Sequence, residues 1–212
     1  MGKREEVRRR TFAEILETAG RMAETEGWRA VTIRRIATEI GYSAPVIYQH
    51  FPSKEALLHT LLERVNAELA ERLRAAVDGQ PAARGPHLAA VAYLEFARTR
   101  PVLYQLMSGA PGTDVDAATR RAAAGDVIAF TRRLIGAWAA ETAADLPGPG
   151  VEDASDLLWG TLHGLAGIGA IEDVGFDRAL RLADQAVTAL LGYWSGPPTN
   201  PEHRPRTVKG EK

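Results

Sequence analysis

The sequence predicts an all-α fold, with a three-helix unit at the N-terminus and a bundle of about six helices behind it. Apolar residues recur at spacings of three and four along most of the chain, which is the period of an amphipathic helix. Prolines and glycines gather in a few short segments between these stretches. No stretch shows the alternation of apolar and polar residues that is typical of a half-buried strand. Together these observations indicate helices packed on helices.

The first helix is predicted over residues 5–26. Its apolar residues share one face at helical spacing, which marks the side that is buried. They are Phe12, Ile15, Leu16, Ala19, Met22 and Ala23. We expect Gly27-Trp28 to end the helix.

Residues 32–58 predict two short helices joined by a tight turn, followed at once by a third helix. Thr32 and Ser43 stand where N-caps are expected, and Gly41 stands where a helix end requires a positive φ. Pro45 falls in a first turn, where proline costs least. The second short helix is too polar to exist for packing alone. This spacing is that of a helix-turn-helix.

A long helix is predicted from Ser53, its cap, to about Val77. Further helices are expected at 87–100, 101–108, 115–143, 153–172 and 177–194, with loops at 78–86, 109–113 and 146–150. The predicted organisation is therefore a helix-turn-helix domain at 1–52 and a larger helical domain at 53–194. The tail at 195–212 is rich in proline and charge, and we expect it to be disordered.

The composition is that of an ordinary soluble chain, with 45% hydrophobic and 25% charged residues among 212. Because there is no cysteine, disulfides and thiolate chemistry are excluded. The N-terminus is charged, and the longest apolar run, at 157–171, is shorter than the roughly 20 residues that span a bilayer. We therefore expect a cytoplasmic protein.

The net charge of −1 gives no indication of a general affinity for polyanions, but five of the first ten residues are Lys or Arg. This arm either faces phosphates or is simply solvated.

The helix-turn-helix resembles the DNA-binding domain of the tetracycline-repressor (TetR) family. The residues that carry the resemblance are Thr32, Ile36-Ala37, Gly41, Ser43, Ile47-Tyr48, His50-Phe51, Lys54-Glu55 and Leu57-Leu58. It implies that the partner is double-stranded DNA. It also implies that base edges face Arg34, Ala44, Pro45 and Gln49, and that phosphates face Thr32, Ser43, Tyr48, His50 and Lys54. Alternatively, Tyr48 and His50 pack within a small domain. Tyr42 stands where a small aliphatic residue is usual in this family, and its role stays open.

The C-terminal region offers candidates for a small-molecule cavity but none for catalysis. Trp159, His163 and Gly164 are similar to the Trp…His-Gly pattern of one subclass of TetR-family C-terminal domains. A cavity for an apolar or aromatic effector is expected among the aromatic and sulfur side chains of these helices, with His163 as a polar anchor. The candidates are Tyr93, Phe96, Tyr104, Met107, Phe130, Trp138, Trp159 and His163. The alternative is that these residues only fill the core.

No metal, cofactor or enzymatic activity is predicted. None of the five histidines lies three or four residues from another, and no nucleophile stands beside a base at a recognisable spacing. The resemblance instead implies a homodimer formed through the last two helices, where Gly160, Gly164, Gly167 and Gly169 interrupt the first of them. The leading hypothesis is a repressor released from a palindromic operator by a small apolar ligand. The alternative is a helical small-molecule-binding or scaffolding protein that does not bind DNA.

Overall fold

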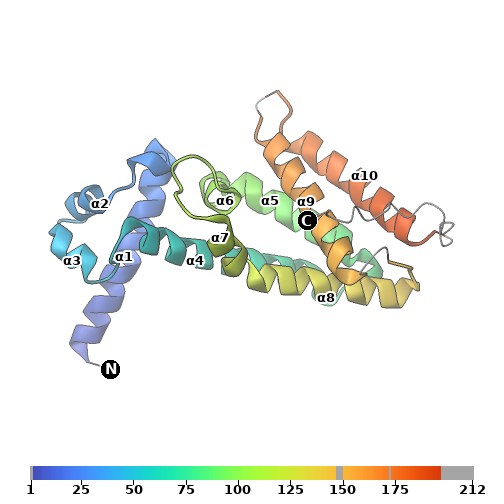
Figure 1. The fold of residues 1–212 in the computed structure, drawn as a ribbon, viewed down its shortest axis with the longest axis horizontal. Helices are drawn as coiled ribbons and strands as arrows, with labels where there is room; N and C mark the ends of the chain where they lie inside the picture. Colours follow the sequence, from blue (N-terminus) through green and yellow to red (C-terminus); the bar gives the residue numbers. More distant parts are fainter. Residues whose placement is uncertain (1, 147–149, 172, 197–212) are drawn as a thin grey trace, which may run out of the picture.

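A computed structural model of the chain describes residues 2–146, 150–171 and 173–196. These parts are helical, and no strand occurs among them, so the predicted all-α fold is confirmed. Figure 1 shows α1, α2 and α3 at one end of the molecule and α8, α9 and α10 at the other, with α4 running between the two ends. No helix in the described segments is long and apolar enough to cross a membrane.

The N-terminal unit contains α1 (Lys3–Glu26), α2 (Ile33–Glu39) and α3 (Ala44–Tyr48), with one 3₁₀ turn (Trp28–Ala30) after α1. The predicted signals of the turn are present. Gly41 has φ +72° between α2 and α3, a backbone conformation that costs a glycine nothing. The Thr32 hydroxyl caps α2 by accepting a hydrogen bond from the Arg35 amide at 3.3 Å. Ser43 precedes α3 with an extended backbone, but its side chain makes no capping bond.

Helix α4 (Lys54–Val77) belongs to two hydrophobic cores. Near its start, Leu57, Leu58 and Leu62 pack with α1, α2 and α3, and Leu106 joins this first core from a later helix. Further along, Leu69 and other residues of α4 pack into the larger C-terminal core. One helix therefore connects the two ends of the molecule through buried contacts, and the first core extends beyond the predicted domain boundary at residue 53.

The C-terminal bundle is built from α4 and the helices that follow it. They are α5 (Gly85–Thr99), α6 (Pro101–Ser108), α7 (Ala117–Ala123), α8 (Gly125–Thr142), α9 (Val151–Gly169) and α10 (Phe176–Trp194), with a 3₁₀ turn (Ala82–Arg84) before α5. Helix α10 packs on α9 and α5, and α8 packs on α4 and α9. Helices α9 and α10 lie close together at Gly169, where a Cβ would lie only 2.9 Å from the Cβ of Ala179.

The predicted helix at 115–143 is wrong, because two helices occupy that region. Asp116 caps α7 by accepting from the Thr119 amide at 2.9 Å, α7 ends at Ala123, and α8 begins at Gly125. Helix α7 has no fully buried residue, so little packing holds it in line with α8. Glycine inside a continuous helix would also cost about 1 kcal/mol relative to alanine. Most of the loop predicted at 146–150, and the tail from 197 onward, lie outside the described residues.

Candidate nucleic-acid interface and effector cavity

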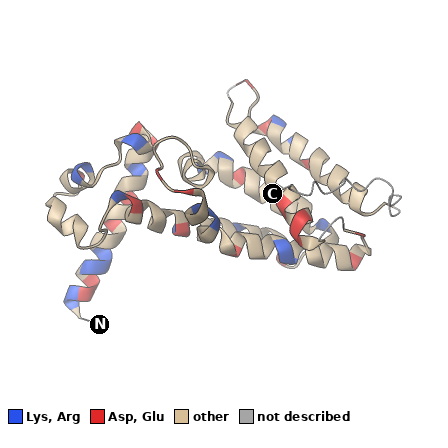
Figure 2. Ribbon diagram, in the orientation of Figure 1, with Lys and Arg blue, Asp and Glu red and all other residues tan. Residues whose placement is uncertain are grey.

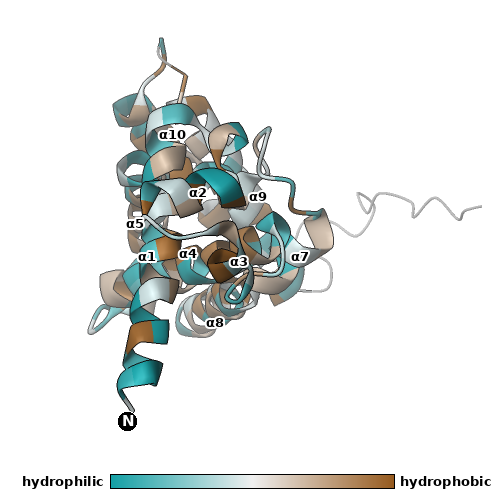
Figure 3. Cartoon of the chain, turned by 90° about the vertical axis from the view of Figure 1, so that its left-hand side faces the viewer, coloured by the Kyte–Doolittle hydropathy of each residue, from teal (hydrophilic) through white to brown (hydrophobic). Residues whose placement is uncertain are grey.

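The predicted base-reading residues lie on an open face formed by α2 and α3. Figure 3 views this end of the molecule and shows both helices at the front. Pro45, Gln49 and Tyr48 are exposed, and Ala44 is half-buried. Tyr48 keeps 51% of its surface exposed, so it is not a packing residue of the domain. The arrangement leaves one turn of α3 available to enter a groove.

The two neighbouring arginines of α2 differ in their contacts. Arg35 bonds Glu26 at 2.6 Å and the Ala30 carbonyl at 3.3 Å, and the hydrogen bond from Arg35 lowers the pKa of Glu26. Arg34 is exposed, and its guanidinium has no ion-pair partner among the described residues. Arg34, which the family resemblance assigns to base reading, is thus the one of the two arginines that remains available for a contact with DNA.

His50 is half-buried and lies beside Phe12, with the ring centroids 6.3 Å apart. Phe12 also stacks on the buried Phe51 at 4.9 Å. Burial, with a smaller contribution from the charge of Arg8, lowers the pKa of His50 below its ordinary value. His50 is therefore neutral at neutral pH in the free protein, where it combines a packing contact with a partly exposed ring. Tyr42 is exposed in the turn, and its role stays open.

Lys54 is held inside the molecule rather than extended into solvent. Its Nζ donates to the carbonyls of Trp28 and Gly112, each at 3.3 Å, and lies 3.6 Å from a carboxylate oxygen of Asp114. Gly112 and Asp114 belong to the loop of residues 109–116 between α6 and α7. The predicted phosphate contact therefore also joins the DNA-binding end to the C-terminal bundle.

Positive charge gathers on the first turns of α1. Figure 2 shows the blue of Lys and Arg at this end of the helix, mixed with the red of Glu. Lys3, Arg4 and Arg8 to Arg10 are exposed there. The geometry is compatible with both a phosphate-facing arm and a solvated one.

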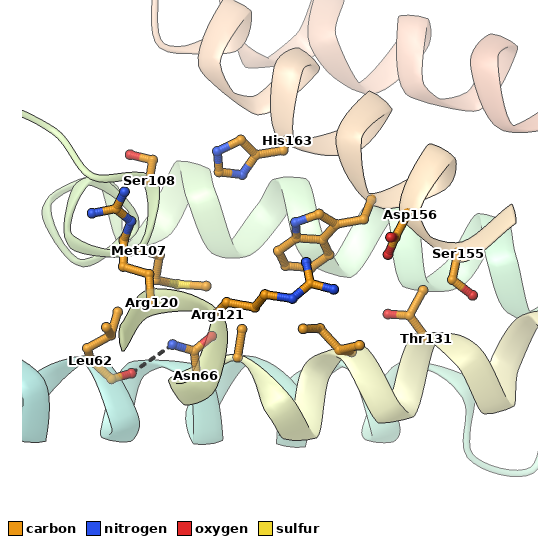
Figure 4. A pocket seen from close by; sticks show the side chains of 13 residues that line it. Leu62, Asn66, Met107, Ser108, Arg120, Arg121, Thr131, Ser155, Asp156 and His163 are labelled. Carbon is orange, nitrogen blue, oxygen red and sulfur yellow. Dashed lines mark hydrogen bonds between the residues drawn. The ribbon is translucent and has the colours of Figure 1, made fainter. Parts of the chain in front are cut away.

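A cavity of about 250 Å³ lies among α4, α6, α7, α8 and α9. Three of the predicted ligand-binding residues line it: Met107 on α6, and Trp159 and His163 on α9. Figure 4 shows His163 and Met107 at the end of the cavity near α6. The remaining predicted residues are buried elsewhere. Phe96, Phe130 and Trp138 belong to the C-terminal core, and Trp138 packs edge-on against Trp194.

Tyr93 and Tyr104 act behind the cavity wall by positioning His163. Their hydroxyls lie 3.0 and 3.1 Å from His163 Nδ1, and the Tyr104 hydroxyl also donates to the His163 carbonyl at 3.1 Å. Burial raises the pKa of both phenols and lowers the pKa of His163, so all three groups are uncharged at neutral pH. The two phenols fix the imidazole and leave its other edge for the cavity.

Apart from His163, the polar residues of the cavity were not predicted from the sequence. Asn66, Arg120, Arg121 and Asp156 all line it. Only Asn66 left a signal in the sequence, as a single amide within the apolar stripe of the long helix. The described residues contain no cluster of His, Asp or Glu that would hold a metal.

A second hollow lies on the outer face of α9 and α10. It is lined by Gly160, Gly164, Leu165 and Ile168 of α9 and by residues of α10. A Cβ built at Gly160 or Gly164 meets nothing within 4 Å, and Leu157 and Ile168 are exposed on the same face. This face is apolar and open, so it is a candidate contact surface.

Two family models match the chain, and together they cover well over half of it. One describes bacterial regulatory proteins of the tetR family and matches residues 15–61. The other describes the tetracyclin repressor-like C-terminal domain and matches residues 87–191.

Solved structures show the same architecture. The regulatory protein SCO4313 is 27% identical and superposes with a TM-score of 0.70, over 90% of this chain and 100% of that one. A tetR family transcription regulator of Shewanella sp. PV-4 is 25% identical, with a TM-score of 0.66 over 86% and 95% of the two chains. Among curated proteins, the nucleoid occlusion factor SlmA of Serratia proteamaculans is 29% identical over 111 residues, which are 51% of this chain and 56% of that protein. The match thus spans about half the length of this relative.

Proposed function

The chain belongs to the TetR family of bacterial regulatory proteins, and on that basis we propose that it is a homodimeric repressor. In this proposal, each copy inserts α3 into the major groove of a near-palindromic operator, and a small molecule in the cavity releases the DNA. The observation that carries it is the open face of α2 and α3. Arg34, Gln49 and Tyr48 are exposed there without a packing role. Family members with this fold are transcription regulators rather than enzymes.

The contacts divide into two kinds. Arg34 reads guanine and Gln49 reads adenine, since these are the side chains that bond those base edges bidentately. Pro45 and Ala44 offer only apolar contact with a thymine methyl. Tyr48 and Ser43, whose hydroxyl makes no capping bond to α3, lie beside them and are assigned to phosphates, which fix the register without reading sequence.

Selection from a pool of random duplexes tests the DNA-binding proposal. We expect a consensus with two-fold symmetry, because a dimer repeats one reading of the groove. Affinity must also fall steeply as salt rises, since bound phosphates release counterions. Recovery of random sequences with affinity independent of salt would instead support the alternative of a helical ligand-binding protein that does not bind DNA.

The dimer is proposed to form through the open face of α9 and α10. Gly164→Leu places a large side chain where a partner helix is expected to approach, so we expect this variant to be monomeric at micromolar concentration in light scattering. Gly125→Leu is the matched control, because a Cβ there also meets nothing within 4 Å but lies at the start of α8. A wild-type protein that is monomeric at the same concentration contradicts both the interface and the symmetric operator.

A further inference from the structure

Asn66 is the most unusual polar group in the cavity wall. It is only 2% exposed, and its Oδ1 has no hydrogen-bond donor in the described parts of the chain. Figure 4 shows its side chain directed from α4 into the cavity. A buried carbonyl oxygen without a donor is destabilising, because its lost hydrogen bond to water is not replaced unless a ligand supplies a donor.

The orientation of the Asn66 amide is fixed by its other end. Nδ2 donates to the carbonyl of Leu62 at 2.8 Å. Turning the amide over would place two oxygens against each other, so Oδ1 must be the atom without a partner. The cavity therefore presents a hydrogen-bond acceptor, and a molecule that satisfies it must bring a donor.

Arg121 supplies the complementary charge. It extends from α7 across the middle of the cavity (Figure 4), and it has no ion-pair partner among the described residues. The neighbouring Arg120 differs, because its guanidinium already donates to the Val115 carbonyl. Arg121 is thus a planar donor group available for a carboxylate or another anion.

The end of the cavity away from His163 and Met107 limits how much negative charge a ligand can carry (Figure 4). Asp156 lines it, and the buried hydroxyls of Thr131 and Ser155 donate to carbonyls of their own helices, which leaves only their oxygen lone pairs facing outward. These groups repel a second anion. A ligand with one negative charge is therefore favoured over a dianion.

The remaining wall is apolar. Leu62, Ile128, Met107 and Trp159 contribute to it. The volume of about 250 Å³ is below the roughly 300–1,000 Å³ of sites for drug-sized molecules. The ligand is thus a small molecule with a short apolar part.

Building on the proposed function, we propose that the cavity binds a small organic monoanion that carries a hydrogen-bond donor beside an apolar group. Arg121 pairs with the anionic group, Asn66 Oδ1 accepts from the donor, and Trp159 covers the apolar part. This class differs from the uncharged apolar or aromatic effector that the sequence predicted, because the predicted rings mostly lie in the core.

Three matched probes separate the contributions of the anionic group and the hydrogen-bond donor to affinity, in calorimetric titrations of the full chain. 3-Phenyllactate has the ring, the carboxylate and the hydroxyl; 3-phenylpropionate lacks the hydroxyl; 3-phenyllactamide lacks the charge. We expect 3-phenyllactate to bind most tightly, at millimolar concentration or below. Losing the hydroxyl costs about 3- to 10-fold in affinity, and losing the charge costs about 10-fold or more.

Two variants assign the contacts to residues. Asn66→Leu removes the hydrogen-bond acceptor while keeping a side chain of similar size, so 3-phenyllactate and 3-phenylpropionate bind with equal affinity. Arg121→Gln removes the charge, so 3-phenyllactate and 3-phenyllactamide bind with equal affinity. Because Arg121 is exposed, this substitution does not prevent folding. Arg133→Gln is the control, because Arg133 is an exposed arginine of α8 that does not line the cavity, and both affinity ratios must stay as in the wild type.

The proposal is overturned if none of the probes binds at millimolar concentration, if the amide binds as tightly as the acid, or if the two variants keep the wild-type ratios. Titration without DNA keeps this test separate from the proposed function. If the protein does not bind DNA but the affinity ratios of the three probes are as expected, only the proposed regulator function is refuted. A protein that binds its operator but ignores the acids refutes only this assignment of the cavity.

Discussion

Replacing Lys54 by alanine removes an ammonium that both joins two parts of the molecule and is assigned to a DNA phosphate. Its two hydrogen bonds to carbonyls measure 3.3 Å, which is slightly longer than the usual N–H···O distance of about 2.7–3.2 Å. Each therefore contributes about 1 kcal/mol, below the roughly 1.5–3 kcal/mol of shorter bonds to charged groups. Asp114 adds at most about 0.5 kcal/mol because its side chain is 65% exposed. The expected loss in the free energy of unfolding is about 2 kcal/mol.

For a chain of this size, that loss lowers Tm by about 4–8 °C. Thermal melts of Lys54→Ala and Asp114→Asn measure it, and the second variant, which removes only the ion pair, shifts Tm by about 2 °C or less. An unchanged Tm in Lys54→Ala refutes the structural role.

Fluorescence anisotropy with a labelled operator tests the second role of Lys54. If Nζ binds phosphate, Lys54→Ala weakens binding to all sequences alike and makes the salt slope shallower by about one unit. Asp114→Asn keeps the ammonium, so its salt slope is that of the wild type. Equal affinity of Lys54→Ala and wild type at both low and high salt refutes the phosphate contact and leaves the structural role in place.

Three further predictions concern DNA reading and pH. Arg34→Ala and Gln49→Ala each cost about 1–3 kcal/mol on the preferred site and relax one base position, and an unchanged consensus in random-duplex selection contradicts them. Because the pKa of His50 lies below its ordinary 6.5 in the free protein, a phosphate contact makes affinity rise as pH falls below neutrality. His50→Gln should abolish that rise in anisotropy measurements, and an identical pH profile refutes the contact. Burial also lowers the pKa of His163, so the unfolded chain binds more protons between that pKa and 6.5, and Tm must fall as pH decreases through this window. His163→Gln reduces that fall, whereas equal slopes show that another group titrates.

Local signals predicted the helix-turn-helix well because each depends on a few neighbouring residues. Thr32 and Ser53 accept the capping bonds that their positions indicated, at 3.3 and 3.2 Å. The positive φ of Gly41 follows from the need to reverse the chain after one short helix. Such features are set within four residues, so a single sequence contains them.

The break in the helix at Ala124 is a feature that local sequence signals do not predict. Residues 117–124 are mostly alanine and arginine, which favour helix throughout and carry no strong apolar stripe. Whether such a stretch stays in line with the next helix is decided by packing against α4, and that packing brings together residues far apart in the sequence. Composition therefore predicted helix correctly but could not predict the change of direction.

The cavity was predicted only in part for a related reason. Periodicity tells which side of a helix is buried, but not whether that side meets another helix or an empty space. Phe130 and Trp159 look alike in the sequence, yet only Trp159 lines the cavity. The better signal is a polar residue within an apolar stripe, because burying it needs a reason. Asn66 fits that rule, and Arg121, which is exposed on a short helix, fits no rule of periodicity.

The motif Tyr-x-His-Phe-x-x-Lys illustrates how one short pattern combines several physical roles. Tyr48 is exposed, His50 lies against Phe12, Phe51 is buried in the core, and Lys54 bonds to the loop of residues 109–116. That loop leads directly into α7, which carries Arg121 of the cavity. A phosphate that draws Nζ away from the Gly112 carbonyl therefore releases a contact of the loop that leads into α7. By linkage, a ligand that strengthens this Lys54–Gly112 contact weakens the phosphate contact by an equal free energy.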